Sequence, residues 1–192
     1  MDLPLDEELQ QDQQEVIEWV PAIDPRPSDI TLVIESWRFH VHRDILMKSS
    51  DYFRAMFSSH MIESRKDVVE LHLVNPEVFS ILVDGMYTGC LALTEDNAFA
   101  VVQAAEMLQI GDPLNSAQLS FMRKTFINVS QCFELMHFCI PLNLTELHCD
   151  ARKFCLAHFW ELKDSTALTS LSLSELYDYL SDTYLVVEAE IH

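Results

Sequence analysis

The chain has 192 residues, of which 49% are hydrophobic, so it carries enough apolar side chains for one large core or two small ones. Its 31 Asp and Glu against 12 Lys and Arg give a net charge of -19, which argues against nucleic acids and anionic membranes as partners. Only three glycines occur, which disfavours glycine-rich phosphate-binding loops and favours helices.

The cysteine count and the first residues indicate the compartment. The five cysteines are odd in number, and the N-terminus has neither a basic region nor an apolar signal core. Both features favour a reducing compartment with free thiols. We therefore expect a soluble cytoplasmic protein, with a nuclear location also open. We interpret the two glycan acceptor patterns, at Asn128 and Asn143, as helix-start chemistry.

Residues 1–28 are predicted to form an acidic extension followed by a linker. Residues 1–20 hold seven acids and four glutamines, with apolar side chains gathered at their end. We expect a short helix there that docks by its last turn. Three prolines within 21–28 then predict an extended, proline-rich linker.

Alternating apolar residues begin at residue 29 and predict two short strands joined by a turn at Ser36. The inward positions of this hairpin are Ile30, Leu32, Ile34, Phe39 and Val41. Two short helices follow at 44–50 and 51–59, and the second carries a face that we expect to be buried, namely Tyr52, Phe53, Met56 and Phe57. Alternation at 67–73 predicts a third strand with Val69, Leu71 and Leu73 on one side.

Longer helices dominate the remainder of the chain. Asn75 before Pro76 is a typical helix start, and Thr88-Gly89 a typical end. After an extended piece at 90–93, Thr94 is expected to cap a helix that ends near Leu108. Further helices are predicted at 116–127, 131–140, 145–160 and 174–181, capped by Ser116, Ser130, Thr145 and Ser174. The predicted class is α+β: short strands ringed by helices over 29–126, then an all-α extension over 127–192.

Several segments together resemble a known family. They are DITLV at 29–33, FHVHR at 39–43, SDYFRAMF at 50–57, VDGMYTGCL at 83–91, AVVQAAEMLQ at 100–109 and LSELYDYLSD at 173–182. In this order they resemble a BTB/POZ domain of the kelch-like type, over 29–126, and a partial BACK domain, over 127–192. The resemblance implies a non-catalytic adaptor that forms homodimers and binds cullin 3 as a subunit of a RING ubiquitin ligase. The substrate to be ubiquitinated cannot be derived.

The resemblance also implies a contact for cullin 3 in the loop after the second short helix. The family's pattern there, a hydrophobic residue, any residue and glutamate, is met by Met61, Ile62 and Glu63. A thioether can adapt to an apolar pocket of a partner, and a carboxylate can accept hydrogen bonds at its rim. The alternative is an ordinary surface loop in which Arg65 and Lys66 pair with Glu63.

Two departures from the family pattern leave alternatives open. The proline-rich linker replaces the family's usual entry to the first strand, so exchange of an N-terminal strand between subunits stays undecided. The sequence stops at His192, where further BACK helices and kelch repeats are expected, as in a short form or a fragment. The alternative function is self-association without cullin binding, as in a transcriptional regulator or a dominant-negative short form of a kelch-like protein.

Polar clusters were weighed as rival sites. Zinc could be considered at six residues with unsuitable spacing: His137, Cys139, His148, Cys149, Cys155 and His158. A nucleophilic Cys149 would need a base aimed at it, whereas adjacent helical residues point about 100° apart. We therefore expect no metal, no cofactor and no catalytic residue. His42, Arg43 and Asp44 could form a charged patch near a dimer axis, but we favour Asp44 as a helix cap.

Overall fold

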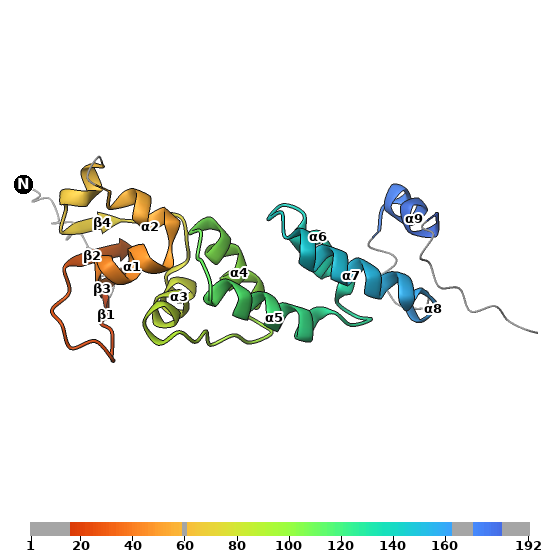
Figure 1. Cartoon of the computed structure of the whole chain (residues 1–192), viewed down its shortest axis with the longest axis horizontal. Coiled ribbons are helices and arrows are strands. Elements are labelled where there is room, and N and C mark those ends of the chain that lie inside the picture. Colours follow the sequence, from red (N-terminus) through yellow and green to blue (C-terminus); the bar gives the residue numbers. More distant parts are fainter. Residues whose placement is uncertain (1–15, 59–60, 163–170, 182–192) are drawn as a thin grey trace, which may run out of the picture.

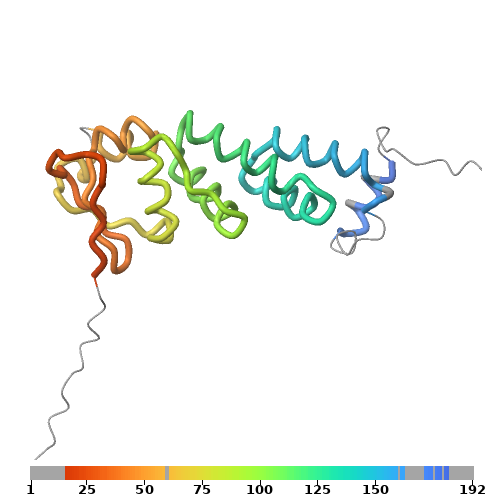
Figure 2. The backbone as a smooth tube through the Cα atoms, turned by 90° about the horizontal axis from the view of Figure 1, so that it is seen from below, coloured from red at the N-terminus to blue at the C-terminus, as the bar shows by residue number. Residues whose placement is uncertain are grey.

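The computed structural model describes residues 16–58, 61–162 and 171–181. The molecule is elongated, with the strands at one end and helices α6 to α9 at the other (Figures 1 and 2). Short strands surrounded by helices lead into an all-helical region, which confirms the predicted α+β class. No helix in the described part is both long and apolar enough to cross a bilayer.

The sheet has four strands in the order β1-β3-β2-β4. The predicted hairpin is present as β2 (Ile30–Ile34) and β3 (Trp37–Val41), which pair antiparallel. The outer strands, β1 (Ile17–Trp19) and β4 (Val68–Glu70), run parallel to β3 and β2 respectively. The third strand is shorter than predicted, and Leu73 is exposed beyond its end.

The N-terminal prediction of a helix is wrong where it can be tested. Residues 17–19 form strand β1, and the Ile17 N–H donates to the Ser36 carbonyl at 3.0 Å. Trp19 packs against the Phe39 ring, with 5.9 Å between ring centroids. Pairing with β3 thus decides the conformation of a segment whose apolar run is too short to specify a helix. The rest of the predicted helix, residues 1–15, lies outside the described residues.

The linker is held against the first helix by ion pairs. Arg26 contacts Asp24 at 2.7 Å and Asp44 at 2.9 Å. Its hydrogen bonds lower the pKa of Asp24 to about 2 and also lower the pKa of Asp44. Asp44 is not the predicted cap, because it lies inside the first helix, where its carboxylate accepts the Ile45 N–H at 2.9 Å. Helix α1 (Arg43–Ser49) begins after His42, and its first N–H, that of Arg43, donates to the Asp29 carboxylate at 2.9 Å.

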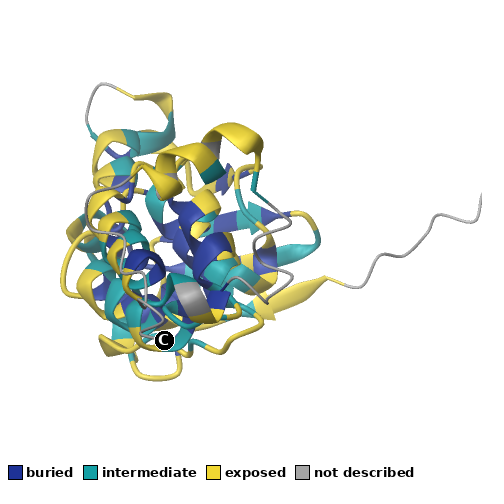
Figure 3. Ribbon diagram, turned by 90° about the vertical axis from the view of Figure 1, so that its right-hand side faces the viewer, coloured by how far each residue is buried: buried dark blue, intermediate teal, exposed yellow. Residues whose placement is uncertain are grey.

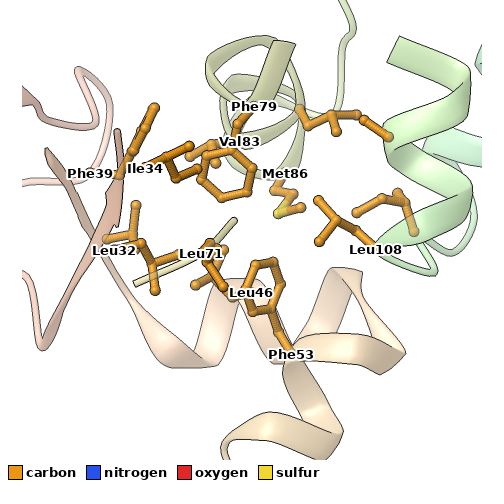
Figure 4. Packing of buried hydrophobic residues seen from close by; sticks show 14 of the residues in the cluster. Leu32, Ile34, Phe39, Leu46, Phe53, Leu71, Phe79, Val83, Met86 and Leu108 are labelled. Atoms are coloured by element: carbon orange, nitrogen blue, oxygen red, sulfur yellow. The ribbon is translucent and has the colours of Figure 1, made fainter. Parts of the chain in front are cut away.

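The first core lies between the sheet and helices α1, α2 (Asp51–Met56), α3 (Pro76–Thr88) and α4 (Ala98–Met107). Figure 4 shows Phe39, Phe53 and Phe79 converging there, and all three are fully buried. The predicted ends of α3 are confirmed. The Asn75 side chain accepts from two N–H groups of the first turn, and Gly89 adopts the left-handed conformation with φ of 76°.

The remaining helices are α5 (Leu114–Phe126), α6 (Cys132–Cys139), α7 (Thr145–Ala157), α8 (Phe159–Leu162) and α9 (Leu173–Leu180). Together with α4, most of them enclose a second core (Figure 3). Helix α4 serves both cores, since Val101 belongs to the first and Val102 to the second. One helix therefore joins the strand-containing end to the helical end.

Several predicted helix caps are wrong. Helix α4 begins at Ala98, because Thr94 and Asn97 first close a turn by exchanging side-chain hydrogen bonds. Ser116, Ser130 and Thr145 make no capping bond, and Ser174 lies inside α9. Asp112 and Asn128 accept the N–H groups near the starts of α5 and α6 instead. The predicted helix over 145–160 is divided into α7 and α8.

Candidate protein-docking site

The three residues of the predicted motif lie at the start of a short 3-10 helix, η1 (Ile62–Arg65), between α2 and β4. The Met61 carbonyl accepts from the Ser64 hydroxyl at 2.6 Å and from the Ser64 N–H at 3.3 Å. The Met61 N–H donates to the Ser58 carbonyl at 3.1 Å. These backbone bonds fix the direction in which the Met61 side chain leaves the turn.

The motif presents apolar side chains to solvent. Met61 is 47% exposed and Ile62 is 72% exposed. Glu63 is partly buried, beside them in the same turn. Adjacent exposed apolar residues on an ordered turn are typical of a surface that another protein covers.

An open groove of about 870 Å³ lies beside this turn. Met61 and Glu63 line it together with side chains from α2, from β4 and from the residues that flank β4: Tyr52, Ala55, Met56, Lys66, Val68, Val69, Glu70 and His72. The predicted buried face of α2 is thus divided. Phe53 and Phe57 enter the core, whereas Tyr52 and Met56 face the groove.

Tyr52 and Glu63 both line the groove, and burial, together with the charge of Glu63, raises the pKa of Tyr52. Within the described residues, Glu63 forms no ion pair with Arg65 or Lys66, contrary to the ordinary-loop alternative. The carboxylate therefore keeps its acceptor capacity for donors of a partner.

Arg43 holds the η1 turn in place, a role that the sequence did not predict. Its guanidinium donates to the carbonyls of Lys66 and Asp29 and lies over the Phe57 ring, 5.6 Å from the centroid. These contacts tie the end of η1 to the start of β2. The sequence indicates Arg43 only as part of a possible charged patch, because no local pattern points to a carbonyl 23 residues away.

The rival cluster in the helical region has a different character. Cys132, Cys139 and Cys155 are buried in the second core, whereas Cys149 is exposed. The Cys155 thiol lies 3.8 Å from the Met136 sulfur, and His158 contacts Glu161 at 3.0 Å. Across residues 16–58, 61–162 and 171–181, no three His, Cys, Asp or Glu side chains gather as a possible metal site. These sulfurs contribute to packing.

Comparison with protein families explains the arrangement. The family model described as "BTB/POZ domain" matches residues 24–125, more than half of the chain. The model described as "BTB And C-terminal Kelch", the BACK domain, matches residues 132–192. The chain belongs to the kelch-like BTB–BACK family. Members of this family typically act as non-catalytic adaptors in protein–protein interaction.

Curated relatives agree with this assignment. Kelch-like protein 21 of Danio rerio is 36% identical over 162 residues, which cover 84% of this chain and 26% of the relative. The Homo sapiens protein of the same name is 35% identical over 163 residues, 84% of this chain and 27% of the relative. Kelch-like protein 25 of Homo sapiens is 34% identical over 164 residues, which cover 85% of this chain and 28% of the relative. The chain thus spans about a quarter of the length of these relatives.

Proposed function

We propose that this BTB–BACK chain is a homodimeric adaptor that binds cullin 3 through Met61, Ile62 and Glu63. As a subunit of a RING ubiquitin ligase it would promote ubiquitination of a protein substrate that is not yet identified. The observation that carries the proposal is the exposed Met61 beside Glu63, on an ordered turn at the edge of a large groove. Family membership supports dimerisation through the BTB domain.

The physical basis of docking is an apolar anchor with a polar rim. Met61 can fill an apolar pocket of the partner while the groove receives a projecting element. Glu63 can accept hydrogen bonds from donors that surround the pocket. The net charge of -19 accelerates encounter with a basic partner surface, more strongly at low salt.

A titration with the cullin 3 N-terminal domain tests the proposal, with molar mass measured by light scattering. The double variant Met61→Ala with Glu63→Ala is expected to bind at least about tenfold more weakly while its dimer mass is unchanged. The matched control, Leu173→Ala with Glu134→Ala, removes an exposed apolar side chain and an exposed carboxylate from the helical end of the molecule. It is expected to bind as the wild type does.

The outcomes separate the alternatives. Equal affinity of the wild type and the Met61/Glu63 variant would refute docking through this turn. A wild-type dimer that ignores cullin 3 would favour the self-association module. A chain that stays monomeric at high concentration would refute the proposed homodimer.

A further inference from the structure

The described methionines differ sharply in exposure, and one of the two most exposed lies at the proposed docking site. Met86, Met122 and Met136 are buried, and Met47 and Met56 are partly buried. Among the described methionines, only Met61, at 47%, and Met107, at 42%, expose a large part of their surface. Because oxidation of methionine follows access to the sulfur, these two thioethers are the expected targets of a dissolved oxidant.

We infer that Met61 is a reversible oxidation site whose conversion to the sulfoxide switches off docking at the η1 turn. This inference rests on the proposed function. The oxidant class is a hydroperoxide, with hydrogen peroxide as the simplest case.

The chemistry balances without any further reagent. The thioether sulfur attacks one oxygen of hydrogen peroxide, the O–O bond breaks, an S–O bond forms, and the second oxygen leaves as water. Sulfur loses two electrons and the peroxide gains them. In the reverse step a dithiol reductant, acting through methionine sulfoxide reductases, returns the thioether, with a disulfide and water as the other products.

The position of Met61 makes this change consequential. The backbone of Met61 is held by Ser58 and Ser64, so the turn keeps the start of this side chain at the surface. Its neighbour Glu63 offers only acceptors when ionised and cannot donate to a sulfoxide oxygen. A sulfoxide pressed into an apolar pocket would leave a strong acceptor unpaired, which weakens binding by about tenfold or more.

Met107 provides an internal control for oxidation without consequence. It has similar exposure but lies at the end of helix α4, and it does not line the groove beside η1. Peroxide is expected to oxidise both residues at similar rates. Only the change at Met61 should affect docking.

The experiment compares the full chain, Met61→Leu and Met107→Leu before and after hydrogen peroxide treatment. Mass spectrometry locates the sulfoxides, and dithiothreitol is added afterwards to reverse oxidation of the exposed Cys90 and Cys149. Affinity for the cullin 3 N-terminal domain is then titrated. Leucine keeps an apolar side chain of similar volume but has no sulfur to oxidise.

Treatment is expected to weaken binding of the wild type and of Met107→Leu by about tenfold or more, and to leave Met61→Leu unchanged. Methionine sulfoxide reductases with a dithiol should restore the wild type. Unchanged affinity of a chain that carries the sulfoxide at Met61, or equal losses in Met61→Leu, would overturn the inference. Failure of the untreated wild type to bind at all would instead refute the proposed function, and the inference with it.

Discussion

The η1 turn of the BTB domain and the α6–α7 helix pair of the BACK domain each carry a methionine, but in opposite surroundings. Met61 is 47% exposed on a turn held by hydrogen bonds, whereas Met136 is 6% exposed and contacts the Cys155 thiol. The helical region holds more of the residue types that suggest chemistry, yet its sulfurs fill a core. The comparison teaches that the exposure of a side chain, more than its type, separates a docking residue from a packing residue.

The largest expected effect comes from truncating the two methionines in turn. Met136→Ala should lower the free energy of unfolding by about 2–5 kcal/mol, because it removes buried contacts and leaves a cavity. Met61→Ala should change it by no more than about 0.5 kcal/mol, because water already reaches this side chain. Urea unfolding followed by circular dichroism measures both. Similar losses in the two variants would contradict the contrast drawn between these regions.

An intermediate loss of stability is expected when Arg43, which holds the η1 turn, is truncated. Arg43→Ala should lower the free energy of unfolding by about 1–3 kcal/mol. The carbonyls of Lys66 and Asp29 lose their donor, and the contact with the Phe57 ring disappears. Arg54→Ala is the control, since Arg54 is exposed and, among the described residues, forms an ion pair only with the exposed Asp51. Hydrogen exchange of the residues around η1 should rise in the first variant alone. Unaltered exchange there would show that Arg43 does not hold the turn.

The smallest effect on the free energy of unfolding is expected at Tyr87, which contacts His42, the residue before Arg43. Its hydroxyl accepts from the His42 N–H at 2.9 Å and lies 2.7 Å from His42 Nδ1. Tyr87→Phe should therefore lower the free energy of unfolding by about 1 kcal/mol at neutral pH, as measured by thermal unfolding.

The pH dependence of the same variant provides a second measurement. Burial raises the pKa of Tyr87 from its ordinary value of 10.0 to about 12. Because the folded state favours the neutral phenol, this stabilisation is complete below pH 10 and is lost as the pH rises toward 12. The difference in free energy of unfolding between the wild type and Tyr87→Phe should therefore decrease between pH 10 and pH 12. A difference that stays constant would exclude Tyr87 as the titrating group.

The features that could be predicted are those specified by neighbouring residues. Alternation over 30–41 was sufficient for the β2–β3 hairpin, and Asn75, Pro76 and Gly89 marked the ends of α3. The position of Met61 between a helix and a strand also followed from the order of these elements. Such signals are local because backbone preference and capping act within a few residues.

The features that were missed depend on contacts between distant segments. Residues 17–19 become a strand because β3 offers an edge, and the Asp29 carboxylate, in place of Asp44, accepts the first N–H of helix α1. In both cases a contact with a segment distant in the sequence decides a feature that neighbouring residues leave open.

The sequence by itself determined the family of this protein, its α+β class and the residues of the Met61–Glu63 motif, because motif order and periodicity are properties of the chain. Only the tertiary structure decided which methionines are exposed, that Arg43 supports the turn, and that Tyr52 and Met56 line a groove while they also pack against the core. Burial is the physical reason: it arises when segments far apart in the chain pack together, and no short stretch of sequence contains it.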